Sequence, residues 1–279
     1  MSLPRSKTLP PTPILPDANV SNCISINNIE IWYALYGAPL NSHQIPTVFL
    51  HGGKISSRWW AHQIRHVAGA GHSVIAMDTR AHGRSTDDPQ VALSYDLFAD
   101  DVAALLDHLQ VPCANFVGWS DGANTCLSLA MRHKQKVKRI FSFGPNYRPD
   151  QAIPYAGETV PFVADLMNRM KEEYKAISPT PEIFDSFKAK VVAMQECCPM
   201  WTEEDFSKID ANSTDVHQRP VVWIVTGDSE ELIQGWVAEK IAEMIQGSVY
   251  LALPDVSHFA PLQDPETFNN SLDQWLSQQ

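Results

Sequence analysis

A serine lies at the centre of a short motif bounded by glycines. The motif is Gly118-Trp119-Ser120-Asp121-Gly122, which follows the apolar run 115–117 and precedes a helical pattern. A sharp strand-to-helix turn strains its central residue, and glycines two positions away on either side let the neighbouring backbone pack closely. Such a turn presents a hydroxyl at the carboxyl edge of a sheet, where the N–H groups of the following helix favour anionic intermediates. Ser120 is therefore predicted to be a nucleophile.

A glycine pair further upstream could supply a hydrogen-bond donor for this chemistry. The apolar run 48–50 continues directly into His51-Gly52-Gly53. Acyl transfer needs N–H donors because negative charge develops on the former carbonyl oxygen, and a glycine lets the main chain approach it. The predicted oxyanion hole consists of the Gly53 N–H and of the Asp121 N–H, directly after the nucleophile. His51 itself is expected to be structural.

A serine hydroxyl needs a base, and the chain has ten histidines. His258 is the best candidate because Val256-Ser257-His258-Phe259 follows the last apolar run, 249–253. It therefore belongs to a loop at the same sheet edge as Ser120. His82, in the loop 78–85, is expected to pack beneath the site instead of reacting.

The third member of such a site is a carboxylate that orients the imidazole. The apolar run 221–226 ends in Gly227-Asp228-Ser229-Glu230-Glu231, which offers three carboxylates. The chain order nucleophile, acid, histidine is then satisfied. Spacing alone does not choose among Asp228, Glu230 and Glu231.

Strand and helix patterns alternate along the chain and would place these loops at one edge. A hairpin is predicted to turn at Asn27-Asn28. Further strands are predicted at 47–50, 74–77, 114–117, 137–143, 221–226 and 248–253, and helices at 59–70, 95–109, 123–133, 236–245 and 265–276. Alternation of this kind predicts an α/β fold with a mostly parallel, doubly wound sheet.

Two segments depart from the alternation. Five prolines crowd the first sixteen residues, so residues 1–20 are predicted to form a flexible or surface-wrapped extension. Residues 148–218 contain helical stretches near 160–176, 182–195 and 202–209 but no convincing strand, and are predicted to be a helical insertion. The core would then comprise residues 21–147 and 219–279.

Composition excludes several classes of partner. The chain has 279 residues and a net charge of −11 without any basic cluster, which argues against nucleic acid and anionic membranes. An odd count of five cysteines fits no disulfide framework or zinc spacing, so reduced, mostly buried thiols are expected. Without a secretory h-region or a membrane span, a cytoplasmic protein is expected.

Taken jointly, these motifs resemble the α/β-hydrolase fold group that includes serine esterases, lactonases and carbon–carbon hydrolases. The resemblance extends from about Ile24 to the end and includes the Asp78-x-Arg80-x-His82-Gly83-Arg84-Ser85 loop. It implies that Glu230 is the acid, three residues after the glycine that ends the strand. Asp228 is the second choice and Asp150 the third. The resemblance also implies that residues 148–218 form a cap over the active site.

The resulting hypothesis is a serine hydrolase with a catalytic triad of Ser120, Glu230 and His258. It would cleave an ester or lactone of a small to medium apolar molecule through an acyl-enzyme, without cofactor or metal. A carbon–carbon hydrolase with the same Ser and His, or a ligand receptor on the same fold, are the alternatives. Lys54 stands where proline iminopeptidases carry proline, and Ser120 excludes a haloalkane dehalogenase.

Large apolar side chains in the insertion have two interpretations. They could line a site for a medium-sized apolar ligand, or they could simply hold the cap together. The residues in question are Phe162, Met167, Met170, Tyr174, Phe184, Phe187, Met194, Met200 and Trp201.

Overall fold

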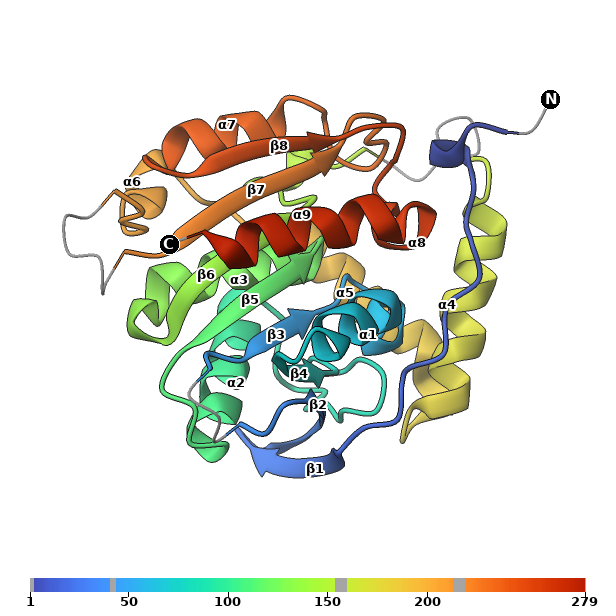
Figure 1. Cartoon of the computed structure of the whole chain (residues 1–279). Coiled ribbons are helices and arrows are strands. Elements are labelled where there is room, and N and C mark those ends of the chain that lie inside the picture. The colour runs from blue at the N-terminus through green and yellow to red at the C-terminus, as the bar shows by residue number, and fades with distance from the viewer. Residues whose placement is uncertain (1–2, 41–43, 154–159, 213–218, 279) are drawn as a thin grey trace.

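An eight-stranded sheet forms the centre of the protein (Figure 1). The computed structural model describes residues 3–40, 44–153, 160–212 and 219–278. The strands follow one another across the sheet in the order β1-β2-β4-β3-β5-β6-β7-β8. Their bounds are β1 Val20–Ile26, β2 Ile29–Gly37, β3 Thr47–Leu50, β4 Ser73–Met77, β5 Ala114–Trp119, β6 Val137–Phe143, β7 Val221–Gly227 and β8 Val249–Leu253.

Strand direction divides the sheet into a hairpin and a parallel part. β2 pairs antiparallel with β1 and β4, whereas all pairs from β4 to β8 are parallel. Asn27 and Asn28 have φ angles of 47° and 62°, as a tight two-residue hairpin turn requires. The predicted hairpin and the predicted mostly parallel α/β sheet are confirmed.

Helices cover both faces of the sheet because the strands alternate their side chains between two apolar clusters. Phe49 points to the cluster that includes α1 and α9, while its neighbour Val48 points to the cluster that includes α2, α3 and α7. Figure 1 shows α1 and α9 in front of the strands and α2 and α3 behind them. The bounds of the core helices are α1 Ala61–Gly69, α2 Tyr95–His108, α3 Asp121–Arg132, α7 Val237–Met244, α8 Ala260–Gln263 and α9 Pro265–Ser277.

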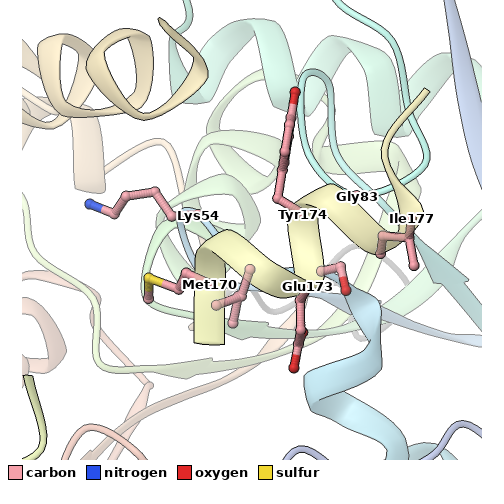
Figure 2. Close-up of a pocket in the computed structure, with 8 residues that line it drawn as sticks. Lys54, Gly83, Met170, Glu173, Tyr174 and Ile177 are labelled. Atoms are coloured by element: carbon pink, nitrogen blue, oxygen red, sulfur yellow. The ribbon is translucent and has the colours of Figure 1, made fainter. Parts of the chain in front are cut away.

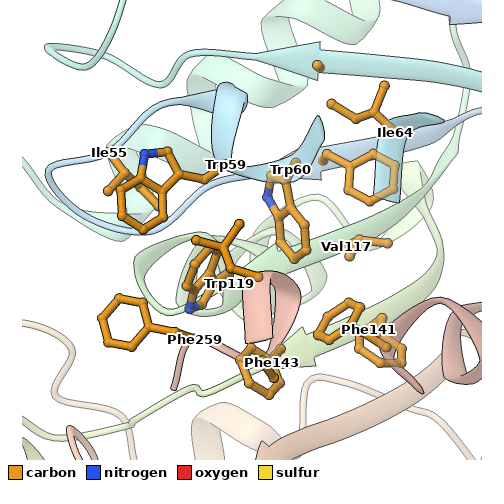
Figure 3. Packing of buried hydrophobic residues seen from close by; sticks show 14 of the residues in the cluster. Ile55, Trp59, Trp60, Ile64, Val117, Trp119, Phe141, Phe143 and Phe259 are labelled. Carbon is orange, nitrogen blue, oxygen red and sulfur yellow. The ribbon is translucent and has the colours of Figure 1, made fainter. Parts of the chain in front are cut away.

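Aromatic side chains fill the cluster beneath the predicted site (Figure 3). The Trp119 ring, next to the predicted nucleophile, lies 5.7 Å from Trp60 and 5.9 Å from both Trp59 and Phe259. Buried rings contribute large apolar areas and prefer such tilted contacts. Packed aromatic rings therefore lie directly beneath the turn at Ser120.

Between β6 and β7 the described residues form helices and no strand of the sheet. These helices are α4 Val163–Ile177, α5 Phe184–Cys197 and the short α6 Glu203–Phe206, which ends earlier than the pattern over 202–209 predicted. Residues 154–159 and 213–218 of the predicted insertion lie outside the described part, as do residues 1–2 of the extension and residues 41–43 and 279 of the core.

The proline-rich extension follows the surface of the protein. Leu9, Leu15 and Ala18 pack against the apolar cluster that includes α1 and α9. Figure 1 shows this segment running beside α4 before it reaches β1. Of the two predicted alternatives, the structure has the surface-wrapped one.

The cysteine thiols are less buried than the sequence predicts. All five thiols are free, but only Cys126 is buried, so the prediction of mostly buried thiols is wrong. Cys23 is exposed on the edge strand β1, and Cys197 is exposed as the last residue of α5. Among the described helices, none has both the length and the apolar character of a membrane span.

A buried ion pair connects the loop after β4 to α2 and to the hairpin. Arg80 donates from Nε and Nη2 to the two carboxylate oxygens of Asp101 at 2.8 and 2.7 Å. Asn27 Nδ2 also donates to Asp101, at 2.8 Å. Both charged side chains are at most 2% exposed, so neither could be solvated if its partner were removed.

Asp101→Ala should lower the free energy of unfolding by about 3–5 kcal/mol, because it leaves the Arg80 guanidinium buried without its carboxylate. Asp100→Ala is the matched control one position earlier on α2, since Asp100 pairs with Arg132 on the surface. It should cost about 0–1 kcal/mol. Urea unfolding of both variants measures the difference, and equal losses would contradict the assignment.

Candidate active site

Ser120 occupies the sharp turn between β5 and α3. Its φ and ψ angles are 56° and −117°, a conformation that a non-glycine residue adopts only under strain. Its N–H donates to the Phe143 carbonyl at 2.8 Å. A Cβ at Gly118 would lie 2.3 Å from the Gly122 carbonyl oxygen, and one at Gly122 would lie 2.1 Å from the Leu50 carbonyl oxygen. The two glycines are therefore what allows this turn to close.

His258 and Glu230 meet in a buried hydrogen-bonded pair. His258 Nδ1 lies 2.9 Å from both carboxylate oxygens of Glu230, and the two side chains are 4% and 3% exposed. The carboxylate also accepts the Leu232 and Ile233 N–H groups at 2.9 and 3.2 Å. An acceptor at Nδ1 fixes the tautomer that leaves Nε2 free to accept a proton.

The environment of His258 has opposing effects on its basicity. Burial by itself lowers the pKa of His258, but the charge and hydrogen bond of Glu230 outweigh it, so the pKa is raised above the ordinary 6.5. Glu231 adds to the effect and accepts the His258 N–H at 3.0 Å. Burial raises the pKa of Glu231, and the Glu230 charge raises it further.

The two alternative acids lie away from the imidazole. Asp228 is exposed and accepts from the Ser229 hydroxyl at 3.1 Å. The Asp150 side chain is 69% exposed and pairs with Arg148. Of the three candidates, the structure brings Glu230 to His258.

The predicted oxyanion-hole segment lies directly against the nucleophile. A Cβ at Gly52 would lie 3.4 Å from Ser120 Cβ. One at Gly53 would lie 2.2 Å from Asp121 Oδ2 and 2.7 Å from Gln195 Nε2. Gly53 and Asp121, the two residues predicted to donate N–H groups, are therefore immediate neighbours, and a side chain at position 53 would require those of Asp121 and Gln195 to shift.

Ser120 and His258 line one cavity of about 80 Å³. Its walls come from loops and helices that are distant in sequence, including α5 and the segment after β6. The lining residues are Tyr95, Ser120, Asp121, Asn146, Ala152, Ile153, Gln195, Leu232, Ile233 and His258.

A family model for the alpha/beta hydrolase fold matches residues 45–182, which contain His51-Gly52-Gly53 and the Ser120 turn. The sheet order and its parallel core agree with that fold. The chain belongs to the α/β-hydrolase superfamily. The match covers about half of the chain, and the structure extends the same fold over the rest of the described residues.

Relatives of this α/β-hydrolase include a protein named as an esterase/perhydrolase and another named as a lactone-degrading enzyme. The bifunctional esterase/perhydrolase DCH of Acinetobacter calcoaceticus is 24% identical over 271 residues, which cover 88% of this chain and 95% of the relative. The solved structure of Est816, an N-acyl homoserine lactone degrading enzyme, has a TM-score of 0.63 and 25% identity, with 91% of this chain and all of that chain covered. The AB hydrolase superfamily protein YisY of Bacillus subtilis (strain 168) is 29% identical, but over only 40% of this chain and 43% of the relative. These similarities support the class of hydrolase.

A polar network that the sequence did not indicate surrounds Asp121. The Asp121 carboxylate accepts from the Tyr95 hydroxyl at 2.9 Å and from Gln195 Nε2 at 3.0 and 3.1 Å. Lys54 Nζ donates to Gln195 Oε1 at 2.8 Å. Burial lowers the pKa of Lys54, although the nearby Asp121 opposes this shift. Tyr95 and Gln195 stand within helical patterns, where sequence alone gives no sign of which face meets the site.

The two other histidines singled out in the sequence are buried packing groups. His51 Nε2 accepts the Thr79 N–H at 3.0 Å, and its ring lies 5.1 Å from that of His82. Burial, together with His51, lowers the pKa of His82 to about 3. In the described part of the chain, no group of three or more His, Cys, Asp or Glu residues is placed to hold a metal ion.

The aromatic and methionine side chains of the insertion do not line the cavity that contains Ser120. Met170, Phe184 and Met194 are buried in the cluster that includes α1 and α9. Tyr174 and Phe187 stack at 4.5 Å and border a separate cavity of about 650 Å³ between residues 81–92 and the helices α4 and α5. The buried positions of Met170, Phe184 and Met194 favour the interpretation that these residues hold the insertion together, whereas Tyr174 and Phe187 also border a cavity.

Glu230→Gln should lower the pKa of His258, because the neutral amide removes the largest of the charges that oppose the effect of burial. Asp228→Asn is the control and should leave the pKa unchanged, since Asp228 is exposed. Imidazole resonances followed by NMR against pH, with His258 assigned from a His258→Asn spectrum, measure both shifts. A large shift in the Asp228 variant alone would contradict the pairing.

Gly144→Ala should displace the imidazole, since the added Cβ would lie 2.7 Å from His258 Cε1. We expect turnover to fall by roughly 10²-fold, as for an ångström-scale misplacement. Gly71→Ala controls for backbone strain, because Gly71 also has a positive φ, 89°, but has no atom within 4 Å of the added Cβ. Equal effects of the two substitutions on activity would refute the steric explanation.

Proposed function

We propose that this α/β-hydrolase is a serine hydrolase that cleaves a carboxylic ester or lactone of a small to medium molecule. The observation that carries the proposal is the single cavity lined by Ser120 and by His258, which is hydrogen-bonded to Glu230. Relatives that act on esters and on N-acyl homoserine lactones support the substrate class.

The proposed reaction begins with proton transfer from the Ser120 hydroxyl to His258 Nε2. Ser120 Oγ then attacks the substrate carbonyl, and the Gly53 and Asp121 N–H groups stabilise the resulting oxyanion. Collapse of the tetrahedral intermediate breaks the bond to the leaving alkoxide, which takes the proton from His258. A water molecule deprotonated by His258 attacks the acyl-enzyme and releases the acid, which restores the Ser120 hydroxyl.

Glu230 would act by orientation and charge. Its carboxylate stabilises the imidazolium that forms when His258 accepts the serine proton. Two main-chain N–H groups hold this carboxylate in place. Because the pKa of His258 is raised, we expect activity to increase as pH rises through that pKa, where the imidazole becomes neutral.

We further propose that residues 148–218 form a cap that closes the site. Ala152, Ile153 and Gln195 come from this segment and line the cavity. At about 80 Å³ the cavity lies below the usual range of roughly 300–1,000 Å³ for ligand pockets, which supports a small acyl group or an outward movement of the cap on binding.

Ser120→Ala should abolish labelling by a fluorophosphonate probe and reduce turnover of p-nitrophenyl esters by roughly 10³-fold or more, because the nucleophile is lost. Ser128→Ala, on the following helix, is the control, since its hydroxyl bonds to Asp96 away from the cavity. Unchanged turnover in the Ser120 variant would refute the proposal. A panel of esters, lactones and β-diketones separates ester chemistry from carbon–carbon cleavage, and acylation without turnover would indicate a receptor.

A further inference from the structure

The N-terminal extension contacts both the helix α4 and the end of α8, next to the loop of His258, two elements that are far apart in sequence. We define residues 5–18 as the strap. Its prolines at positions 10, 11, 13 and 16 lack N–H groups and keep the chain from pairing as a strand. Its main-chain carbonyls are therefore available to side-chain donors from the core and from the insertion.

One end of the strap contacts the residue that holds the His258 loop. Gln263, at the end of α8 and 7% exposed, donates from Nε2 to the Thr8 carbonyl at 2.9 Å. The same amide donates to Ser257 Oγ at 2.9 Å, and its Oε1 accepts the Ser257 N–H at 2.8 Å. Ser257 directly precedes His258, so Gln263 joins the strap to the proposed base.

The next residue of the strap contacts the helix α4. Arg169 donates from Nη2 to the Leu9 carbonyl at 3.2 Å and from Nη1 to the Pro10 carbonyl. Its guanidinium carbon also lies 5.9 Å from the Trp59 ring centroid. Leu9 follows Thr8 directly. The carbonyl that accepts from Gln263 and the carbonyl that accepts from Arg169 therefore belong to consecutive residues.

The inner face of α4 is closed against the core. Glu173 accepts from Trp59 Nε1 at 2.8 Å. Figure 2 shows Met170, Glu173 and Tyr174 of α4 at a pocket that Lys54 and Gly83 also line, and the free volume there is only about 10 Å³. Outward movement of α4 would therefore break its contacts with the strap as well as those with the core.

We infer that the strap couples α4 to the loop of His258, with Arg169 and Gln263 as positioning residues on its two sides. The part that concerns catalysis rests on the proposed function. Displacement of α4 would then loosen the imidazole, and a closed α4 would hold it in place. The coupling would limit turnover to the state in which the insertion is closed.

Hydrogen exchange in the full chain tests the coupling without any reference to activity. Arg169→Met keeps the apolar stem over Trp59 but removes both donors to the strap. Exchange should become roughly tenfold faster not only in α4 but also over residues 257–264, which Arg169 does not contact. Gln263→Glu, which keeps the acceptor for the Ser257 N–H, should reciprocally accelerate exchange in α4.

Two controls separate coupling from general loosening. Asp165→Asn removes only the ion pair of Arg169 within α4 and should leave residues 257–264 unchanged. Peptides over β5 report global unfolding and should stay protected in every variant. Faster exchange that is confined in each variant to the element carrying the substitution would overturn the inference.

A kinetic measurement tests the catalytic part. Both Arg169→Met and Gln263→Glu should lower kcat for p-nitrophenyl acetate several-fold and change KM less than twofold, because the base and not the binding surface is displaced. The kcat of the double variant should be no lower than that of the less active single variant, since each substitution by itself breaks the link through the strap. Additive losses would refute a shared path. Absence of turnover in the unmodified protein would refute the proposed function, while the exchange experiment would still decide whether the strap couples the two elements.

Discussion

The buried hydrogen-bonded pair between Glu230 and His258 is the interaction on which the proposed chemistry depends. A histidine this deeply buried would lose basicity without a compensating charge. The carboxylate supplies that charge, and the Leu232 and Ile233 N–H groups keep it directed at the imidazole. Gly144, which has a positive φ and would collide with His258 if it had a side chain, leaves the space that the ring occupies.

The parallel sheet explains why these groups meet. β5, β7 and β8 end at the same edge, so the loops that follow them bring Ser120 and His258, with its partner Glu230, to one cavity although they span 139 positions from 120 to 258 inclusive. β3 ends beside them and places Gly53 against Asp121. Apolar side chains on both faces fix the strands, which leaves the polar chemistry to the loops.

Features with a local cause could be predicted from the sequence. The apolar runs located the strands, Asn27-Asn28 located the hairpin turn, and glycines around Ser120 indicated its strained turn. His258 followed from its place after the last strand, whereas the choice of Glu230 over Asp228 came from resemblance. Tyr95, Gln195 and the strap contacts of Gln263 could not be predicted, because they depend on which helix face packs against Asp121 and which against the strap. The exposure of Cys197 likewise depends on how α5 packs.

The proposed mechanism requires Ser120 to carry a covalent acyl group during turnover. The most direct measurement is to quench a reaction with p-nitrophenyl acetate at steady state and to map acetylated peptides by mass spectrometry. We expect an acetyl group on Ser120 that forms within a burst of p-nitrophenol release and disappears once substrate is exhausted. Sustained turnover with Ser120 unmodified, or with the acetyl group on another residue, would contradict it.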